Sequence, residues 1–190
     1  MRLISCSMAT MVLAGWAFAQ GSTVHPSERR IYFLRDNSHK RWCGYASEPR
    51  LRAQVQVLRA MVVGAAYYEA NIITVVHVTE VDETGDWAVN DAYTFDEKGG
   101  IAALRRTINV IPEDFSEEQV FRISGGKATE QSGVYRDLHT GKLVLEKTAD
   151  WFEPPPVMTD PRKFDFWALI AAQRQSVWSR GEACVPDVPK

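Results

Sequence analysis

The sequence lacks the short motifs that would place it in a functional class at once. It has no G-x-S-x-G nucleophile elbow, no H-E-x-x-H pair, no phosphate-binding loop and no dinucleotide-binding fingerprint. It also lacks a surplus of positive charge, because 22 Lys and Arg stand against 24 Asp and Glu, for a formal net charge of −2. Proteins that bind nucleic acid usually present a basic surface, so this composition argues against nucleic acid as a partner.

Nothing else in the composition is extreme. The 190 residues fit one domain, and 45% hydrophobic with 24% charged residues are ordinary for a globular protein. We therefore expect one domain with a core that needs no cofactor and no metal. The alternative is a histidine–carboxylate metal site that uses two of the histidines in polar segments, which are His25, His39 and His139.

Long apolar runs are missing except at the N-terminus. Leu3 to Phe18 carries no charge, follows Met1-Arg2 and leads into Ala17-Phe18-Ala19. Small residues at these positions predict a signal peptide over 1–19, with cleavage near Ala19 and export to the periplasm or the extracellular space. The run is shorter than the roughly 20 residues of a membrane-spanning helix, although an uncleaved N-terminal anchor is the alternative. After signal removal we expect no membrane span.

Cysteine is scarce, with three in the chain. Cleavage of the signal peptide would remove Cys6 and leave Cys43 and Cys184. An even pair in an oxidising compartment predicts a disulfide, which would tie the N-terminal arm to the C-terminal tail. Neither residue has the local spacing of a metal site, and the competing interpretation is a metal-binding or catalytic thiol.

Strand-like runs separated by turn residues fill the middle of the chain. Such runs predict an antiparallel meander of about six to nine strands, curved into a half-open barrel. Alternation from Leu51 to Val57 also predicts a strand, although a helix through Leu51, Val55 and Leu58 is the other interpretation. The runs that we assign to strands are 60–69, 72–81, 86–95, 101–110, 119–123 and 127–136.

The C-terminal part has a different pattern. Glu153-Pro154-Pro155-Pro156 predicts a stiff linker, and Asp160 with Pro161 predicts the start of a helix that stops near Gly181. One face of that helix should pack on the sheet, and Arg174 falls within it with its stem over an aromatic ring. This face comprises Phe164, Trp167, Ile170, Ala171, Val177 and Trp178.

These patterns together predict an α+β fold, an antiparallel β-meander with a C-terminal helix on one face. The expected organisation is a signal peptide (1–19), an N-terminal arm (20–47), an antiparallel sheet (48–150), and a Pro-rich linker, helix and tail of the same domain (151–190).

One set of polar residues suggests a site. A three-residue loop over 83–85 would place His77 opposite Asp91, and a four-residue loop over 97–100 would place Asp91 opposite Arg106. A short connection at 70–71 would place Gly64 opposite His77, where a glycine allows close approach of a ligand or another backbone. The row would then form the floor of a small polar pocket in the concave face of the sheet.

Three interpretations of this row remain open. It is structural if the polar groups satisfy one another and fix the strand register. It binds a ligand if Arg106 holds an anionic group. It is catalytic if Asp91 orients His77 for acid–base chemistry.

The function that we favour is an exported, non-enzymatic module that binds a small apolar or anionic ligand, or a partner protein, in the concave face. One alternative is a small exported hydrolase or isomerase that uses His77 with Asp91. Another is a structural or inhibitory protein that binds its partner through an exposed sheet edge.

Overall fold

A computed structural model describes residues 29–145, 151–171 and 182–187. The predicted signal peptide and the second half of the predicted C-terminal helix, with Arg174, Val177 and Trp178, lie outside the described residues. None of the helices within the described ranges is long and apolar enough to cross a membrane.

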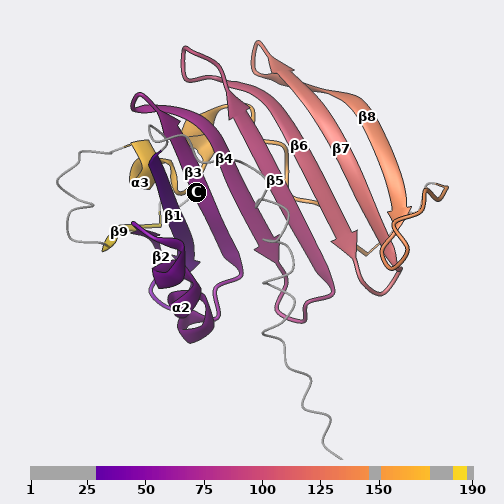
Figure 1. Cartoon of the computed structure of the whole chain (residues 1–190), viewed down its shortest axis with the longest axis horizontal. Coiled ribbons are helices and arrows are strands. Elements are labelled where there is room, and N and C mark those ends of the chain that lie inside the picture. The colour runs from indigo at the N-terminus through magenta and orange to yellow at the C-terminus, as the bar shows by residue number, and fades with distance from the viewer. Residues whose placement is uncertain (1–28, 146–150, 172–181, 188–190) are drawn as a thin grey trace, which may run out of the picture.

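The described chain forms one nine-stranded antiparallel sheet (Figure 1). The strand order is β8-β7-β6-β5-β4-β3-β1-β2-β9, so β8 and β9 are the two edges and the sheet does not close. The meander is confirmed from β3 to β8, and strands from both ends of the chain extend it. The strands are β1 (Arg29–Asp36), β2 (Arg41–Tyr45), β3 (Val62–Glu69), β4 (Ile72–Val81), β5 (Trp87–Phe95), β6 (Ile101–Val110), β7 (Phe115–Ser124), β8 (Lys127–Asp137) and β9 (Glu182–Pro186).

The strand expected from Leu51 to Val57 is wrong, because this segment lies in helix α2 (Glu48–Leu58). Pro49 occupies the first turn, and Arg52 pairs with Glu48 one turn before it at 2.5 Å. Leu51 is fully buried, and Val55 and Leu58 pack in the same cluster, which is the i, i+4, i+7 pattern of a helix. Leu, Arg and Gln are good helix formers, so the apparent alternation of two was a coincidence of spacing.

Two parts of the chain pack on opposite faces of the sheet. Helix α2 packs on one face over β1, β2 and β3, against Leu34, Cys43 and Val63. The C-terminal strap, which we define as residues 151–171, packs on the opposite face and contributes to the largest core cluster. In Figure 1 α2 lies in front of the sheet, and the orange strap passes behind it.

The strap is less helical than the sequence predicted. A short 3-10 helix (η2, Pro161–Lys163) and helix α3 (Trp167–Ala171) are separated by Phe164, whose backbone is extended. Phe164 and Phe166 both point into the core at a spacing of two residues, which a continuous helix does not allow. Their rings stack on each other with centroids 4.9 Å apart, and Phe166 also stacks on Phe33 at 4.5 Å.

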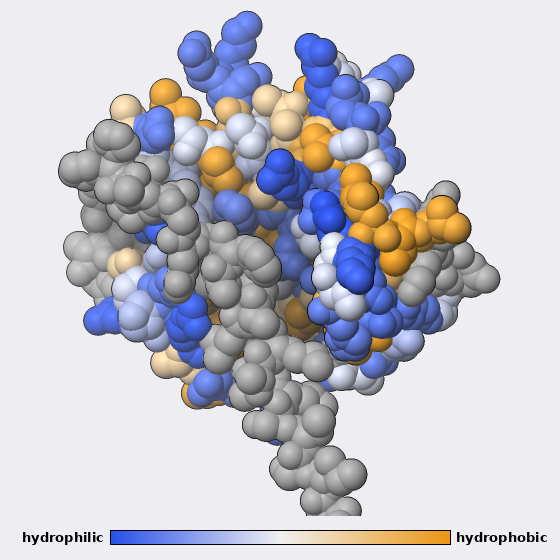
Figure 2. All heavy atoms as spheres, turned by 45° about the vertical axis from the view of Figure 1, so that its right-hand side comes forward, coloured by the Kyte–Doolittle hydropathy of each residue, from blue (hydrophilic) through white to orange (hydrophobic). Residues whose placement is uncertain are grey.

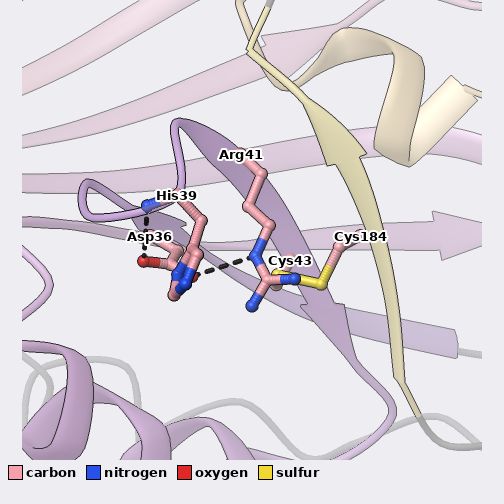
Figure 3. Close-up of a disulfide and its surroundings, with 5 residues drawn as sticks. All are labelled: Asp36, His39, Arg41, Cys43 and Cys184. Atoms are coloured by element: carbon pink, nitrogen blue, oxygen red, sulfur yellow. Dashed lines mark hydrogen bonds and ion pairs between the residues drawn. A yellow bond between two sulfur atoms is a disulfide. The ribbon is translucent and has the colours of Figure 1, made fainter.

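The predicted disulfide joins β2 to the edge strand β9 (Figure 3). Cys43 lies directly opposite Cys184 in the strand register, with Cα atoms 4.0 Å apart. Just beyond β9, Asp187 accepts hydrogen bonds from Arg35 Nη2 at 2.6 Å and from Trp42 Nε1 at 2.8 Å. The C-terminal strand is thus held by a covalent bond and by a carboxylate.

The turn beside the disulfide is fixed by a buried carboxylate (Figure 3). Asp36 is fully buried and accepts from Arg41 Nε at 2.9 Å and from His39 Nδ1 at 2.8 Å. Burial alone would raise the pKa of Asp36, but these hydrogen bonds outweigh it and hold the pKa below its ordinary value. The observed role of His39 is therefore to stabilise this turn through Asp36.

Removing the disulfide should destabilise the fold without abolishing it. The bond closes a loop of 141 residues, for which chain entropy predicts about 4–5 kcal/mol, or a fall in Tm of roughly 10 °C in a domain of this size. We expect this fall in the variant Cys43→Ala/Cys184→Ala, measured by circular dichroism. Dithiothreitol should lower the Tm of the wild type equally and leave the variant unchanged. Equal Tm values for oxidised wild type and variant would contradict the prediction.

Candidate functional site

Asp91 and Arg106 face each other on β5 and β6, as the sequence predicts. Arg106 Nε donates to Asp91 Oδ1 and Arg106 Nη2 donates to Asp91 Oδ2, both at 2.7 Å. Arg106 is 2% exposed and Asp91 is 9% exposed, so this bidentate ion pair is buried. Burial alone would lower the pKa of Arg106, but the Asp91 carboxylate outweighs it and raises the pKa.

The same pair holds the C-terminal strap. Arg106 Nη1 donates to the carbonyl oxygen of Pro155 at 2.6 Å. Tyr93 donates its hydroxyl to Asp91 Oδ2 at 3.2 Å and accepts from the backbone N–H of Met158 at 3.4 Å. Burial, together with the Asp91 charge, raises the pKa of Tyr93. The polar groups on this face thus form hydrogen bonds with one another and with the backbone of the strap, which is a structural role.

His77 does not belong to this row, and the predicted register between β4 and β5 is wrong. His77 lies opposite Ala92, and Val78 lies opposite Asp91. The connecting loop is one residue longer than expected, because Asp82 pairs with Trp87 through backbone and side-chain hydrogen bonds. A one-residue change moves every side chain of a strand to the other face, so His77 and Asp91 point in opposite directions.

A second irregularity separates His77 from Gly64. The two-residue turn at 70–71 is present, with Glu69 opposite Ile72. The register then shifts by one between Tyr67 and Tyr68, so that Gly64 lies opposite Val78 rather than His77. Such a bulge has no clear sequence signal, because it leaves one extra residue in an otherwise regular β-branched run.

Gly64 does allow a close approach, but the group that approaches is Phe33. A Cβ atom added at Gly64 would overlap the Phe33 ring and lie 2.5 Å from the carbonyl oxygen of His77. Phe33 is fully buried, and the strap covers it through Phe166. The position predicted as a pocket floor is therefore filled by the protein's own core.

His77 lies on the other side of the sheet, next to Tyr67 with ring centroids 5.3 Å apart. The Arg30 guanidinium sits 4.9 Å from the centre of the Tyr67 ring. Although His77 is exposed, crowding by its neighbours partly desolvates the imidazole and lowers its pKa, and the positive charge of Arg30 lowers it further. Uncharged imidazole can both donate and accept a hydrogen bond.

This second side, over β4 to β8, is the open face. We define it by the outward residues of these strands, which alternate with those under the strap. No described element lies over it, and its centre carries small or polar side chains, mostly half-buried or exposed. They include Val75, Thr79, Asn90, Ala92, Thr94, Ala103, Thr107, Asn109 and Val120.

The charges on the open face have one predominant sign. Arg105 and Arg122 are exposed, as is Lys127, and no ion pair or side-chain hydrogen bond is found for any of them in the described part of the chain. Within β4 to β8 as described, the acidic residue on this face is Glu118, which pairs with Arg136 at 3.5 Å. A chain with net charge −2 thus presents a basic surface here.

These cations are not among the site residues predicted from the sequence. The available signal was the Arg105-Arg106 pair within a strand, because neighbours in a strand point to opposite faces. Once Arg106 is assigned to one face, Arg105 belongs to the other. Figure 2, in which the β8 edge comes forward, shows hydrophilic and hydrophobic residues side by side over the part that is not grey, with a group of hydrophobic atoms at the right of the view.

Metal ligation has no support in the described ranges, where no group of three or more His, Cys, Asp and Glu side chains is arranged to hold an ion. His39 is bound to Asp36, and His139 lies 3.6 Å from Asp114 in an exposed pair. Comparison of the chain with protein-family models, with curated proteins and with solved structures finds no match.

Gly64 should not tolerate a side chain. In the variant Gly64→Ala the new methyl group meets a buried ring and a backbone oxygen, so we expect a loss of about 2–3 kcal/mol in the free energy of unfolding. Urea unfolding measures it. Ala65→Gly is a control that leaves the Phe33 contact intact. A variant Gly64→Ala as stable as the wild type would mean that the ring does not pack on this glycine.

The two adjacent arginines should behave in opposite ways. Arg106→Met leaves the Asp91 carboxylate buried without its partner, and should cost about 3–5 kcal/mol and expose the strap to proteolysis. The additional change Asp91→Leu should recover much of that loss. Arg105→Met makes the same chemical change one residue away on the open face, and should alter stability by less than about 0.5 kcal/mol. Equal losses for both single variants would contradict the two-face assignment.

Proposed function

We propose that the chain is an exported, non-enzymatic module that binds an acidic partner protein through the open face. The observation that carries the proposal is a face of β4 to β8 over which no described element lies. Arg105, Arg122 and Lys127 lie on it, exposed and unpaired within the described ranges. Charge complementarity of this kind steers association and selects partners of opposite sign.

Export is part of the proposal. Residues 1–19 have the pattern of a signal peptide, and the Cys43–Cys184 disulfide is compatible with an oxidising compartment. The expected destination is the periplasm or the extracellular space.

A protein fits the open face better than a small molecule does. Small-molecule sites are concave and mostly apolar, whereas this face presents exposed cations among small polar residues. A small apolar or anionic ligand on the opposite face would have to displace the strap from Arg106 and Tyr93.

The other two functions have less support. His77 and Asp91 lie on opposite faces, so the acid–base pair that a hydrolase or isomerase needs is not assembled. Pairing through the β8 edge is discouraged by a bulge at Gln131 and by the segment that already bonds to Tyr135 and Asp137.

Photo-crosslinking in the protein's own cell tests the proposal. A photo-reactive residue at Thr94, which is exposed on the open face, should give a discrete protein adduct. The change Arg105→Glu/Arg122→Glu should abolish that adduct without lowering Tm, because both side chains are exposed and unpaired. The matched control is Lys163, which is exposed on the strap.

An adduct from Thr94 that depends on both arginines, with none of the same mass from Lys163, supports the proposal. An adduct that persists after charge reversal, or no adduct at all, overturns it. Recovery of the protein with residues 1–19 still attached in the cytoplasm would overturn its export.

A further inference from the structure

From the arrangement of the cations on the open face, we infer that they form a ladder for an extended acidic segment of polypeptide, with carboxylates at alternate residues. The ladder consists of Arg105, Arg122 and Lys127. This inference rests on the proposed function and names the chemistry of the partner.

The three cations lie on a diagonal across β6, β7 and β8. Arg105 lies opposite Val120, so Arg122 is its diagonal neighbour two residues along β7. Arg122 lies opposite Thr129, so Lys127 is in turn the diagonal neighbour two residues along β8. Diagonal neighbours on one face of an antiparallel sheet are about 7–8 Å apart.

The spacing of the ladder matches that of an extended chain. A strand rises about 3.3–3.4 Å per residue and alternates its side chains, so carboxylates at every second residue repeat at nearly 7 Å on one side. Arginine offers a carboxylate two parallel hydrogen bonds, which gives the two arginine positions of the ladder directional preference as well as charge.

The neighbours of the ladder leave room for such a segment. Ala103 lies opposite Arg122, and Val120 lies opposite Arg105, so the rungs are separated by short side chains. Within β4 to β8 as described, the acidic residue of this face, Glu118, is paired with Arg136 on the side of Arg105 away from Lys127. Within the described ranges, the three cations of the ladder thus form no ion pair and can bind the carboxylates of a partner.

The test is a titration of the full chain with synthetic peptides, followed by calorimetry at low ionic strength. An alternating Glu-Thr peptide should bind, and a peptide with the same residues in the order Glu-Glu-Thr-Thr should bind more weakly. Removal of each arginine, in Arg105→Gln or Arg122→Gln, should weaken binding by about twofold to fivefold, and the double variant by about tenfold. Salt should weaken it further, because the cations are exposed.

The control variant is Arg162→Gln, which removes an exposed arginine on the strap and should leave peptide binding unchanged. Equal binding of the two peptides overturns the ladder in favour of unspecific attraction. Binding to phosphatidylcholine vesicles containing phosphatidylglycerol, or to polyphosphate, with no binding of the alternating peptide also overturns it.

The inference and the proposed function can fail separately. An adduct from Thr94 that depends on the arginines, without binding of the alternating peptide, rejects the ladder and keeps the docking face. Peptide binding with no adduct in the cell keeps the ladder's chemistry and rejects the proposed function. Self-association that is lost in the double variant would replace the acidic partner with a second copy of the chain, and overturns both.

Discussion

The arrangement of the whole molecule depends on the buried ion pair between Asp91 and Arg106. Two of the arginine's donors are used by Asp91, and a third reaches the Pro155 carbonyl. A buried charge pair of this kind contributes less to net stability than to specificity, because desolvation offsets much of its attraction. What the pair specifies here is the position of the strap. Because the strap is fixed on one face, no described element lies on the other face of β4 to β8, which is the face of the proposed function.

Of the three residues of the predicted row, the structure brings two together and places the third on the other face. The position of Arg106 opposite Asp91 is confirmed, although the loop between β5 and β6 is one residue shorter than expected, because a bulge between Thr94 and Phe95 restores the expected register. His77 was misplaced because Asp82 lengthens the preceding loop by one residue. The hydrophobic pattern could not prevent the error, since Val75, Val76 and Val78 make both faces of β4 look apolar.

Local sequence patterns also predicted the wrong secondary structure where packing in the core determines the backbone conformation. Phe164 and Phe166 look like members of a helix. In the structure Phe166 stacks on Phe33 and Phe164 stacks on Phe166, and the backbone at Phe164 is extended so that both rings enter the core. Helix α2 was missed for the opposite reason, because its apolar residues satisfy two periods over a short window. The disulfide could be predicted without any of this, since two cysteines in the expected mature chain leave one pairing.

Arg105 and Arg106 are neighbours in β6, but their side chains lie on opposite faces of the sheet and in different environments. Arg106 is desolvated, and its hydrogen bonds to Asp91 and Pro155 are completed within the chain. Arg105 is exposed and forms no ion pair within the described ranges, because Glu118, its diagonal neighbour on β7, is paired with Arg136 instead. A guanidinium that only served solubility would do so equally well beside an acidic neighbour, as Arg136 does beside Glu118. The cations that stay unpaired within the described ranges are the feature on which the proposed partner of opposite charge depends.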